Sequence, residues 1–301
     1  MPPSIKRSPD AVRGVVYGLA AYLIWGCFPL FFSLFEGVPA WEVLIHRVIW
    51  SCLFLAGLIS VLGRWSAVRV ALANPAGLGR VLACAVLIAA NWGIFIHAVE
   101  SRQVFQASLG YFLTPLVNVA LGMLVLHERM AVLQRWAVVL AGIAIGVQLF
   151  VLGELPWITL LLALTFGTYG LLRKQVSLDG LSGLFVETLL LLPFALIALL
   201  WLMYSGSSSF PGDASRNGLL VASGVVTALP LMAFAGAARR LRLSTLGFLM
   251  YVNPTMQFVT ALLIFNEPLS SVQLATFVLI WIGLAMYSWS AWRNRPSGNG
   301  D

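Results

Sequence analysis

The stretch LGYFLTPLVNVALGMLVLHERM (109–130) decides the fold, because a similar stretch, LGFLMYVNPTMQFVTALLIFNEPL (246–269), occurs later in the chain. Their mid-segment prolines, Pro115 and Pro254, are 139 residues apart (254 − 115), which is close to half of the 301-residue chain. An apolar segment that is duplicated and interrupted by a helix breaker is typical of the substrate region of secondary transporters. We therefore predict helix breaks at Pro115 and Pro254, and ask whether the two copies cross the membrane in opposite directions.

The composition of the chain excludes a soluble globular protein. Hydrophobic residues make up 60% of the sequence, charged residues make up 10%, and the mean hydropathy is +0.93. Soluble domains carry about 25% charged residues. The net charge of +7 comes from Lys and Arg scattered over short loops, without the basic stripe or tail that a nucleic-acid partner would require. The composition predicts an all-α polytopic membrane protein.

Apolar runs of about 20 residues, the length that a spanning helix needs, are separated by short polar or Pro/Gly-bearing turns. The first run is longer than the apolar core of a signal peptide and lacks a convincing cleavage site, so we interpret it as an uncleaved span. We predict ten transmembrane helices, at 14–35, 40–62, 80–99, 104–126, 132–152, 156–172, 183–204, 217–238, 244–265 and 270–292.

The distribution of Lys and Arg predicts the direction of each span. With a cytoplasmic N-terminus, fifteen of the eighteen Lys and Arg residues fall on the inner side and only Arg47, Arg102 and Arg216 fall outside. Because each half has five spans, the second half must enter the membrane from the opposite side. The terminal glutamates of the two copies, Glu128 and Glu267, would then lie at opposite faces, where we expect them to cap or anchor helix ends.

Two further matches at an offset of 141 extend the duplication over whole halves. Trp25-Gly26 corresponds to Phe166-Gly167, and His46 corresponds to Glu187. We predict two inverted five-helix repeats, in which Pro115 and Pro254 meet near the membrane midplane, with both termini cytoplasmic. The expected divisions are 1–13 (cytoplasmic N-terminus), 14–152 (first repeat), 156–292 (second repeat) and 293–301 (cytoplasmic tail).

Seven blocks spread over nearly the whole chain resemble the RarD branch of the EamA-type transporters, within the drug/metabolite transporter superfamily. The resemblance implies two EamA repeats, a bacterial inner-membrane location, and export or exchange of small organic molecules, without fixing a substrate. At His97 the chain departs from the aromatic residue that the resemblance leads us to expect. The blocks are AYLIWGCFPLFF, VPAWEVLIHRVIWS, NWGIFIHAV, SLGYFLTPLVNVALG, FGTYGLLRKQ, ETLLLLP and GFLMYVNPTMQF.

Polar and aromatic side chains within the predicted spans are candidates for a substrate cavity. Polar groups in the hydrocarbon region usually face a bundle interior or a water-filled cavity, although they also serve as hydrogen-bonded glue between helices. Aromatic residues with a few polar groups are typical of binding sites, but any one of them more often packs in a core. The candidates are Trp25, Asn91, Trp92, Tyr111, Asn118, Tyr169, Tyr251, Asn253 and Gln257.

Ionisable residues in the spans are candidates for coupling or gating. Glu42 and His46 are four residues apart and share a helix face, and Arg47 follows His46. For Arg47 and Glu42 we favour a gate or a structural ion pair over substrate chemistry. Glu42, His46 and Arg47 are predicted near the outer end of span two, and His97 and Glu100 end span three at that same outer level. We also predict close helix packing at Gly14-x-x-x-Gly18 and Gly142-x-x-x-Gly146.

Glu187 lies about one turn inside span seven, and a desolvated carboxyl there could exchange a proton, with His46 as its symmetry mate. The alternative is a static ion pair with Arg173 or Lys174. The coupling or gating candidates are therefore His46, Glu187, Arg47 and His97.

Signatures of ATP hydrolysis, zinc proteases, serine hydrolases and dinucleotide binding are absent from the sequence, and so are metal-ligand spacings. We expect no enzyme activity, no cofactor, no ATP and no nucleic-acid partner. The expected partners are a small-molecule substrate, membrane lipids and H+ as a candidate coupling ion; the sequence gives no oligomeric state. The sequence thus favours a secondary transporter that works by alternating access. The alternatives to it are an uncoupled facilitator of the same fold, an integral membrane enzyme or a lipid-handling protein.

Overall fold

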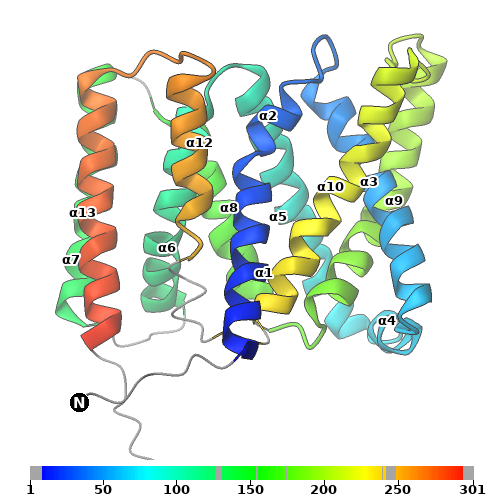
Figure 1. Ribbon diagram of the computed structural model, residues 1–301, viewed down its shortest axis with the longest axis horizontal. Coiled ribbons are helices and arrows are strands. Elements are labelled where there is room, and N and C mark those ends of the chain that lie inside the picture. Colours follow the sequence, from blue (N-terminus) through cyan, green and yellow to red (C-terminus); the bar gives the residue numbers. More distant parts are fainter. Residues whose placement is uncertain are drawn as a thin grey trace, which may run out of the picture.

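The computed structural model describes residues 9–125, 131–153, 155–173, 175–238, 240–241 and 249–293, and every regular element in them is a helix. Figure 1 shows these helices side by side in one slab. They are α1 (Pro9–Gly26), α2 (Phe28–Phe32), α3 (Ala40–Val61), α4 (Trp65–Leu72), α5 (Pro75–Glu100), α6 (Val104–Val125), α7 (Val132–Leu152), α8 (Trp157–Arg173), α9 (Gly180–Tyr204), α10 (Ala214–Ala238), α12 (Val252–Leu263) and α13 (Ser271–Arg293).

Eight helical stretches within the described residues are long and apolar enough to cross a membrane: α1 with α2, then α3, α5, α6, α7, α9, α10 and α13. The protein is therefore an all-α polytopic membrane protein, as the composition predicts. The predicted spans six and nine fall on α8 and α12, which have 17 and 12 residues. At 1.5 Å per residue these two helices are shorter than the roughly 30 Å hydrocarbon core.

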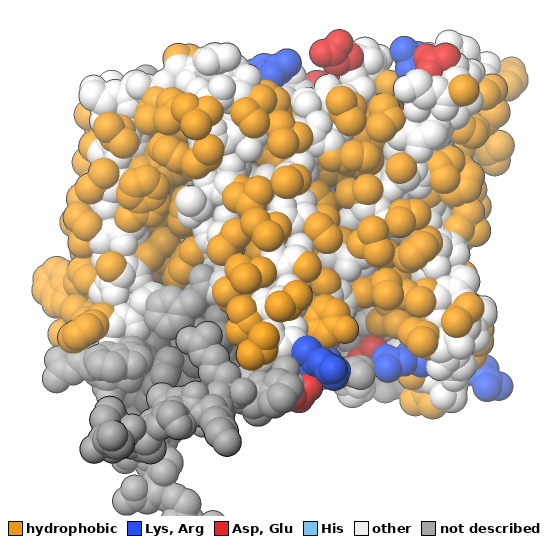
Figure 2. Space-filling model, in the orientation of Figure 1, with side chains coloured by type: hydrophobic (Ala, Val, Ile, Leu, Met, Phe, Trp, Pro, Cys, Tyr) orange, Lys and Arg blue, Asp and Glu red, His pale blue; other side chains and the backbone are white. Residues whose placement is uncertain are grey.

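The surface of the slab has the pattern that a bilayer requires. Figure 2 shows a broad apolar band between two opposite rims where the charged side chains gather. Large apolar side chains point outward in this band: Phe150 is 88% exposed and Trp201 is 65% exposed. Burying such side chains is favourable, so their outward position indicates that lipid covers them.

Local sequence signals account for several helix boundaries. Asn74 accepts a hydrogen bond from the Gly77 amide and Pro75 follows it, so α5 begins with a polar cap and a proline in its first turn. Asp179 caps α9 by accepting from the amides of its first turn. α7 ends at Gly153, whose φ of 68° is in the left-handed region that glycine adopts without strain.

Three pairs of helices, α3 with α9, α6 with α12 and α7 with α13, pack against each other and run antiparallel. In α7 and α13, Thr276 donates to the carbonyl of Ala144, while Gly283 packs on the backbone of Ala137, so the residue numbers run in opposite directions. In α3 and α9, Val48 clusters near Ala195 whereas the end of α3 clusters near the start of α9.

The third antiparallel pair, α6 and α12, is joined by a carboxylate. Glu267, which follows α12, accepts hydrogen bonds from the amides of Val104 (2.7 Å) and Phe105 (2.9 Å) in the first turn of α6. Carboxylates are favoured at helix N-termini because the amides there lack partners within the helix. The prediction that Glu267 caps a helix end is confirmed, while Glu128 lies outside the described residues.

Close packing occurs at only one of the two predicted glycine motifs. A Cβ placed at Gly14 or Gly18 would lie 2.8 Å from the side chains of Arg240 and Leu249, respectively, so α1 makes a close approach there. At Gly142 and Gly146 a Cβ would have no described neighbour within 4 Å. The prediction of close packing at Gly142 and Gly146 is wrong, because α7 turns that face away from α13.

Candidate functional site

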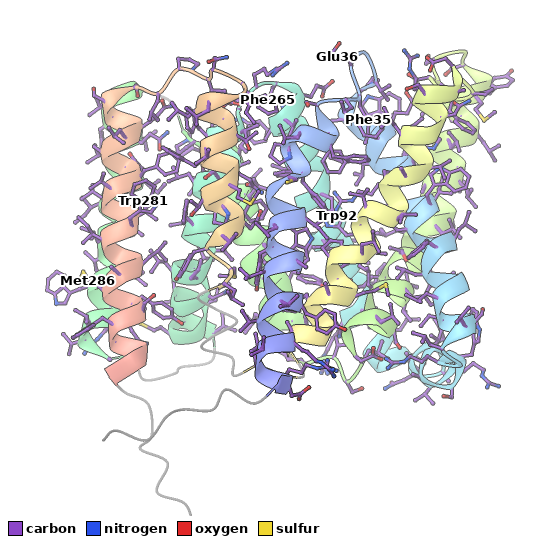
Figure 3. The ribbon with its side chains drawn as sticks, viewed as in Figure 1. Phe35, Glu36, Trp92, Phe265, Trp281 and Met286 are labelled. Atoms are coloured by element: carbon purple, nitrogen blue, oxygen red, sulfur yellow. The ribbon has the colours of Figure 1, made fainter. Side chains whose placement is uncertain are left out.

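The most deeply buried cation in the described interior is Arg47 of α3, which is 3% exposed. Its guanidinium carbon lies 4.1 Å from the ring centre of Trp92 in α5, and 5.2 and 5.5 Å from the rings of Phe32 and Phe28 in α2. Its Nε donates a 2.8 Å hydrogen bond to the hydroxyl of Thr227 in α10. Figure 3 shows Trp92 at about mid-height in the slab. We call these five residues the Arg47 cage.

The cage holds no carboxylate within ion-pair distance of Arg47 among the residues that the structure describes. The expectation of a structural ion pair at Arg47 is therefore wrong. Instead, three aromatic faces and one hydroxyl surround the guanidinium. Aromatic faces attract a cation through their quadrupole, most strongly where water is excluded.

A hydrogen-bonded polar network lies beside the cage. Asn91 of α5 donates to the Leu162 carbonyl (3.1 Å) and to the Thr165 hydroxyl (3.0 Å) in α8. The Tyr111 hydroxyl of α6 donates to the amide oxygen of Asn91 at 3.2 Å, and it is near enough to Arg47 for an electrostatic interaction. Asn91 thus ties three helices together next to the charge.

A second cluster lies near the start of α3. Glu42, fully buried, accepts hydrogen bonds through one oxygen from the Ser208 hydroxyl (2.9 Å) and the Ser209 amide (2.7 Å) of the α9–α10 connection. Its other oxygen has no partner among the described residues. One turn further, His46 accepts from the indole of Trp50 (3.3 Å) and its ring lies 5.0 Å from the ring of Phe210, while its Nε2 is buried without a described partner.

His97 does not join this second cluster. It is half exposed, lies 3.7 Å from Glu100 and contacts the ring of Trp157 at 5.8 Å. Glu100 in turn accepts from the amide of Ala40 at 3.3 Å, at the start of α3. Among the four candidates for coupling or gating, His97 is the one that the structure places at the surface.

A third cluster lies near the start of α9. Glu187, 1% exposed, accepts a 3.3 Å hydrogen bond from the Tyr169 hydroxyl and lies 3.6 Å from Nε of Arg173, both in α8. Arg173 also donates to the carbonyls of Leu178 and Asp179 in the α8–α9 connection. The ion pair with Arg173 that the sequence left open is therefore present; Lys174 lies outside the described residues.

The two proline segments meet. Ser108 of α6 donates to the carbonyl of Pro254 at 2.8 Å, and the rings of Phe112 and Tyr251 stack with centres 6.5 Å apart. Pro115 does not break its helix: α6 is continuous from Val104 to Val125, so the predicted break there is wrong. A single proline removes one amide donor, and helices packed on several sides tolerate that loss.

Pro254 lies in the first turn of α12, where a missing amide costs little. Residues 242–248, before this helix, lie outside the described part of the chain. One turn along α12, Gln257 donates to the side chain of Asn253 at 2.8 Å, and its own amide oxygen is buried without a described partner. These two candidates face each other within one helix.

The remaining cavity candidates line helix seams. Asn118 is exposed on α6 with its oxygen 3.3 Å from where a Cβ of Gly167 in α8 would lie. Trp25 packs between Tyr22 of its own helix and Phe234 of α10, with ring centres 5.5 and 5.8 Å away. The structure thus gathers Trp92, Tyr111 and Asn91 around Arg47, and leaves Trp25 and Asn118 at other seams.

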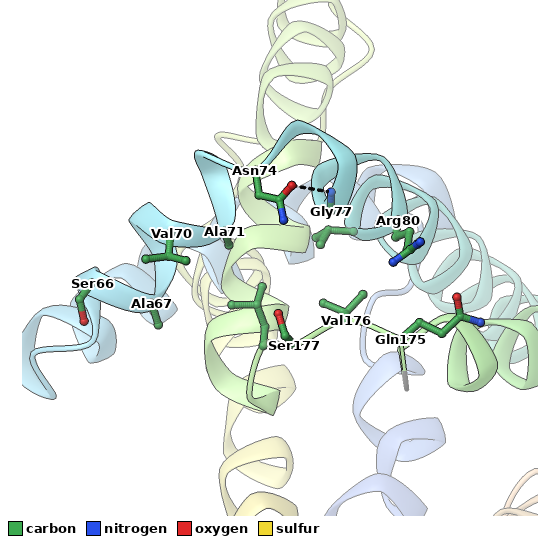
Figure 4. A pocket seen from close by; sticks show the side chains of 12 residues that line it. Ser66, Ala67, Val70, Ala71, Asn74, Gly77, Arg80, Gln175, Val176 and Ser177 are labelled. Carbon is green, nitrogen blue, oxygen red and sulfur yellow. Dashed lines mark hydrogen bonds between the residues drawn. The ribbon is translucent and has the colours of Figure 1, made fainter.

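Two cavities open at opposite rims. One of about 460 Å³ lies between α4, the start of α5 and residues 175–178, with Asn74, Arg80 and Gln175 in its wall (Figure 4). Another of about 150 Å³ lies at the opposite rim beside Glu36, Asp213 and Arg216. Neither includes the candidate site residues, so we place the site at the buried clusters.

The carboxyl groups of Asp179 and Glu267, outside the spans, have shifted pKa values. Burial acts to raise the pKa of Asp179. Hydrogen bonds from the first turn of α9, together with Arg64 at 2.9 Å, outweigh burial and lower this pKa. Burial raises the pKa of Glu267, against the opposing effect of the Phe105 and Val104 amides and of Arg102. Among the described residues, no three His, Cys, Asp or Glu side chains form a metal-binding group.

Sequence reasoning missed the partners that come from distant segments. Thr227 and the α2 rings of Phe28 and Phe32 were not predicted, nor were the serines of the α9–α10 connection that bind Glu42. A hydroxyl residue inside an apolar span is a weak signal, since it more often bonds a carbonyl one turn back in its own helix. Thr227 does that too, donating to the Ser223 carbonyl.

Comparison with known proteins gives the family. The EamA-like transporter family matches residues 12–150. Protein RarD of Salmonella typhi is 46% identical over 276 residues, which are 91% of this chain and 94% of that protein. RarD of Escherichia coli strain K12 is 44% identical over 276 residues (91% and 93%), and an uncharacterized transporter of Vibrio cholerae is 44% identical over 280 (93% of each).

The chain belongs to the EamA-like transporter family. A solved protein structure covers 94% of this RarD-like transporter and 99% of its own chain with a TM-score of 0.58, at 17% identity, and supports the fold alone. The RarD-like chain is thus a multi-pass membrane transporter, and relatives such as the Vibrio cholerae protein are named as transporters, not as enzymes.

Proposed function

We propose that this RarD-like protein is a secondary transporter of the bacterial inner membrane that moves a small organic solute, as an exporter or exchanger, by alternating access. Its two inverted five-helix repeats would be residues 14–152 and 156–292, giving ten crossings with both termini cytoplasmic. Rocking one repeat against the other would open a central site to each side in turn.

One observation carries this proposal: residues that the proposed repeat would relate make matching contacts. A Cβ at Gly26 of α1 would lie 2.7 Å from the sulfur of Met256 in α12, and a Cβ at Gly167 of α8 would lie 2.9 Å from Cγ1 of Val117 in α6. Gly167 follows Gly26 by 141 residues, and Met256 follows Val117 by 139. Such paired contacts are what a two-fold axis between the halves would produce.

The helix neighbours support the same axis. α1 packs on α10 and α12, and its counterpart α8 packs on α5 and α6, which are the counterparts of α10 and α12. The three pairs that would straddle the axis (α3 with α9, α6 with α12, α7 with α13) all pack together. In Figure 1, α1 begins and α13 ends at the same face, which supports an even number of crossings.

Polar clusters at opposite ends of the bundle are suited to act as gates. Near the start of α3, buried Glu42 holds the Ser208–Ser209 connection of the other half. Near the start of α9, Arg173 and Glu187 join two helices, and Asp179 bonds Arg64 of the other half at 2.9 Å. Opening either side would require one of these groups of contacts to separate.

Within this scheme, Glu187 and its symmetry mate His46 are our candidates for proton coupling. Both are buried and each lies about two turns inside its own helix. Glu187 would exchange a proton when its contact with Arg173 opens. The Arg173–Glu187 contact at 3.6 Å also supports the second candidate, an uncoupled facilitator in which this pair is only structural.

Flux through proteoliposomes tests the proposal. The full-length protein would be reconstituted, and uptake and efflux of a panel of labelled metabolites followed with and without a pH gradient. Coupling predicts that flux of a transported solute follows the gradient and that Glu187→Gln removes this dependence. The matched control is Glu36→Gln, an exposed carboxyl outside the gates.

Flux that ignores the gradient, or a Glu187→Gln variant with an unchanged pH profile, would select the facilitator. No protein-dependent flux for any solute would contradict the transport mechanism.

A further inference from the structure

The free edge of Arg47 is the feature of the interior that the gating scheme leaves unexplained. Nε is occupied by Thr227, while the two terminal nitrogens have no hydrogen-bond acceptor among the described residues. The guanidinium is nevertheless almost completely buried. Leaving a buried charge without a counter-charge is strongly unfavourable, so the transport cycle should supply one.

The cage geometry determines how a counter-charge can approach. Trp92 covers one face of the planar guanidinium at 4.1 Å, with the Phe28 and Phe32 rings next nearest. One face is covered and Nε is bonded, while the edge that carries the two terminal nitrogens has no hydrogen-bond partner among the described residues. Two parallel N–H donors on such an edge match the two oxygens of a carboxylate.

The surroundings of the cage limit the rest of the ligand. No second Lys or Arg contacts the cage in the described part of the chain, so one guanidinium faces one negative charge. The neighbouring titratable group is Tyr111, which bonds Asn91 and is uncharged at neutral pH. Around these groups the lining is aromatic, with Phe95 5.9 Å from Tyr111 between ring centres.

The cage also spans the two halves of the molecule. Arg47 and Trp92 belong to the first half, whereas Thr227 belongs to the second. A solute bound at Arg47 would therefore contact the seam that alternating access must rearrange.

We propose that Arg47 binds the carboxylate of the transported solute, so that the substrate class is organic monocarboxylates with an apolar or aromatic body. This assignment rests on the proposed transport function. Trp92 positions the guanidinium from one face, and Thr227 fixes its Nε. Tyr111 and Asn91 are the nearest polar groups for a hydroxyl or amide on the solute.

Binding to the purified full-length protein in detergent tests the assignment, using carboxylates and their uncharged amides of the same shape. The pairs are propionate with propionamide, phenylacetate with phenylacetamide, and indole-3-acetate with indole-3-acetamide. Titration calorimetry and thermal stabilisation would give the affinities. We expect at least one carboxylate to bind at least about tenfold more tightly than its amide, because charge-assisted hydrogen bonds are lost in the amide.

Variants locate the effect. Arg47→Gln should abolish the preference for carboxylate, and Arg47→Lys, which keeps the charge without the fork, should retain part of it. Arg69→Gln, which removes an exposed cation of α4, is the matched control and should bind as wild type. The comparison of carboxylate with amide in the wild type does not depend on any variant folding.

Three results would overturn the assignment: amides that bind as tightly as carboxylates, an Arg47→Gln variant with wild-type carboxylate affinity, or no carboxylate binding up to about 10 mM. Flux separates this assignment from the transport proposal. Carboxylates that bind through Arg47 but never cross the proteoliposome membrane would contradict transport alone. Flux of uncharged solutes without carboxylate binding would contradict the Arg47 assignment alone.

Discussion

Replacing Gly167 with alanine should destabilise the protein through one identifiable contact. A Cβ at this position of α8 would lie 2.9 Å from Cγ1 of Val117 in α6, closer than carbon atoms pack, while the oxygen of Asn118 would be 3.3 Å away. The backbones of α6 and α8 must therefore separate, or Val117 must leave its position.

The size of the effect follows from two opposing contributions. Overpacking a tight seam costs about 1–3 kcal/mol, and replacing glycine with alanine inside a helix gains about 1 kcal/mol. We expect a net loss of about 1 kcal/mol for Gly167→Ala. At Gly142 of α7, where a Cβ meets no described atom within 4 Å, the same substitution should stabilise by about 0.5–1 kcal/mol.

Thermal unfolding in detergent would compare the two variants with wild type and with Val117→Ala. The double variant Gly167→Ala with Val117→Ala removes the overlapping methyl group, so the two changes should offset each other by about 1 kcal/mol or more in a double-mutant cycle. Additive effects, or a Gly167→Ala variant as stable as Gly142→Ala, would refute the close approach of α6 and α8.

Three further substitutions probe other contacts. Glu267→Gln keeps one acceptor but loses the charge at the start of α6, and thermal unfolding should show a loss of about 1–3 kcal/mol; an unchanged melting temperature would contradict the cap. Gly183→Ala would place a methyl group on the Arg173 guanidinium, so the melting temperature should fall and the pH profile of flux should shift; neither change would occur if Arg173 could move aside freely. Because the folded-state pKa of Asp179 is lowered, its contribution to stability is complete above the unfolded-state pKa of about 4 and is lost as the pH falls through the lower folded value. A pH series of melting temperatures should show this loss in wild type and not in Asp179→Asn.

The membrane fold could be predicted because hydrocarbon imposes long apolar runs, and eight of the predicted spans meet that criterion. The position of Glu267 just beyond an apolar segment predicted that it would cap or anchor a helix end, but only the structure shows that this end is the start of α6. The prediction of a helix break at Pro115 failed because the sequence does not show that neighbouring helices pack on α6 and support it. The prediction of close packing at Gly142 and Gly146 in α7 failed for a related reason, since the spacing of glycines does not show which helix face contacts another helix.

The candidate site could be predicted in its charged residues but not in their partners. A buried arginine in a membrane helix attracts attention by its cost alone, so Arg47 could be singled out. The side chains around Arg47 come from α2, α5 and α10, and α2 and α10 are more than 100 residues apart in the sequence. Only tertiary packing brings Thr227 to Arg47. The absence of a carboxylate partner among the described residues could not be predicted from the sequence, because Glu42 on the same helix was a candidate partner.

Alternating access between the two halves is the central claim, and paired distances across both ends of the bundle test it most directly. Spin labels on the exposed positions Trp41 and Asp213 report one end, and labels on Leu62 and Ser177 report the other, in a chain whose three cysteines are replaced. Distances measured by double electron–electron resonance, between about pH 5 and pH 8 and with the panel carboxylates, should change in opposite directions at the two ends. Distances that stay fixed, or that lengthen and shorten together at both ends, would contradict alternating access.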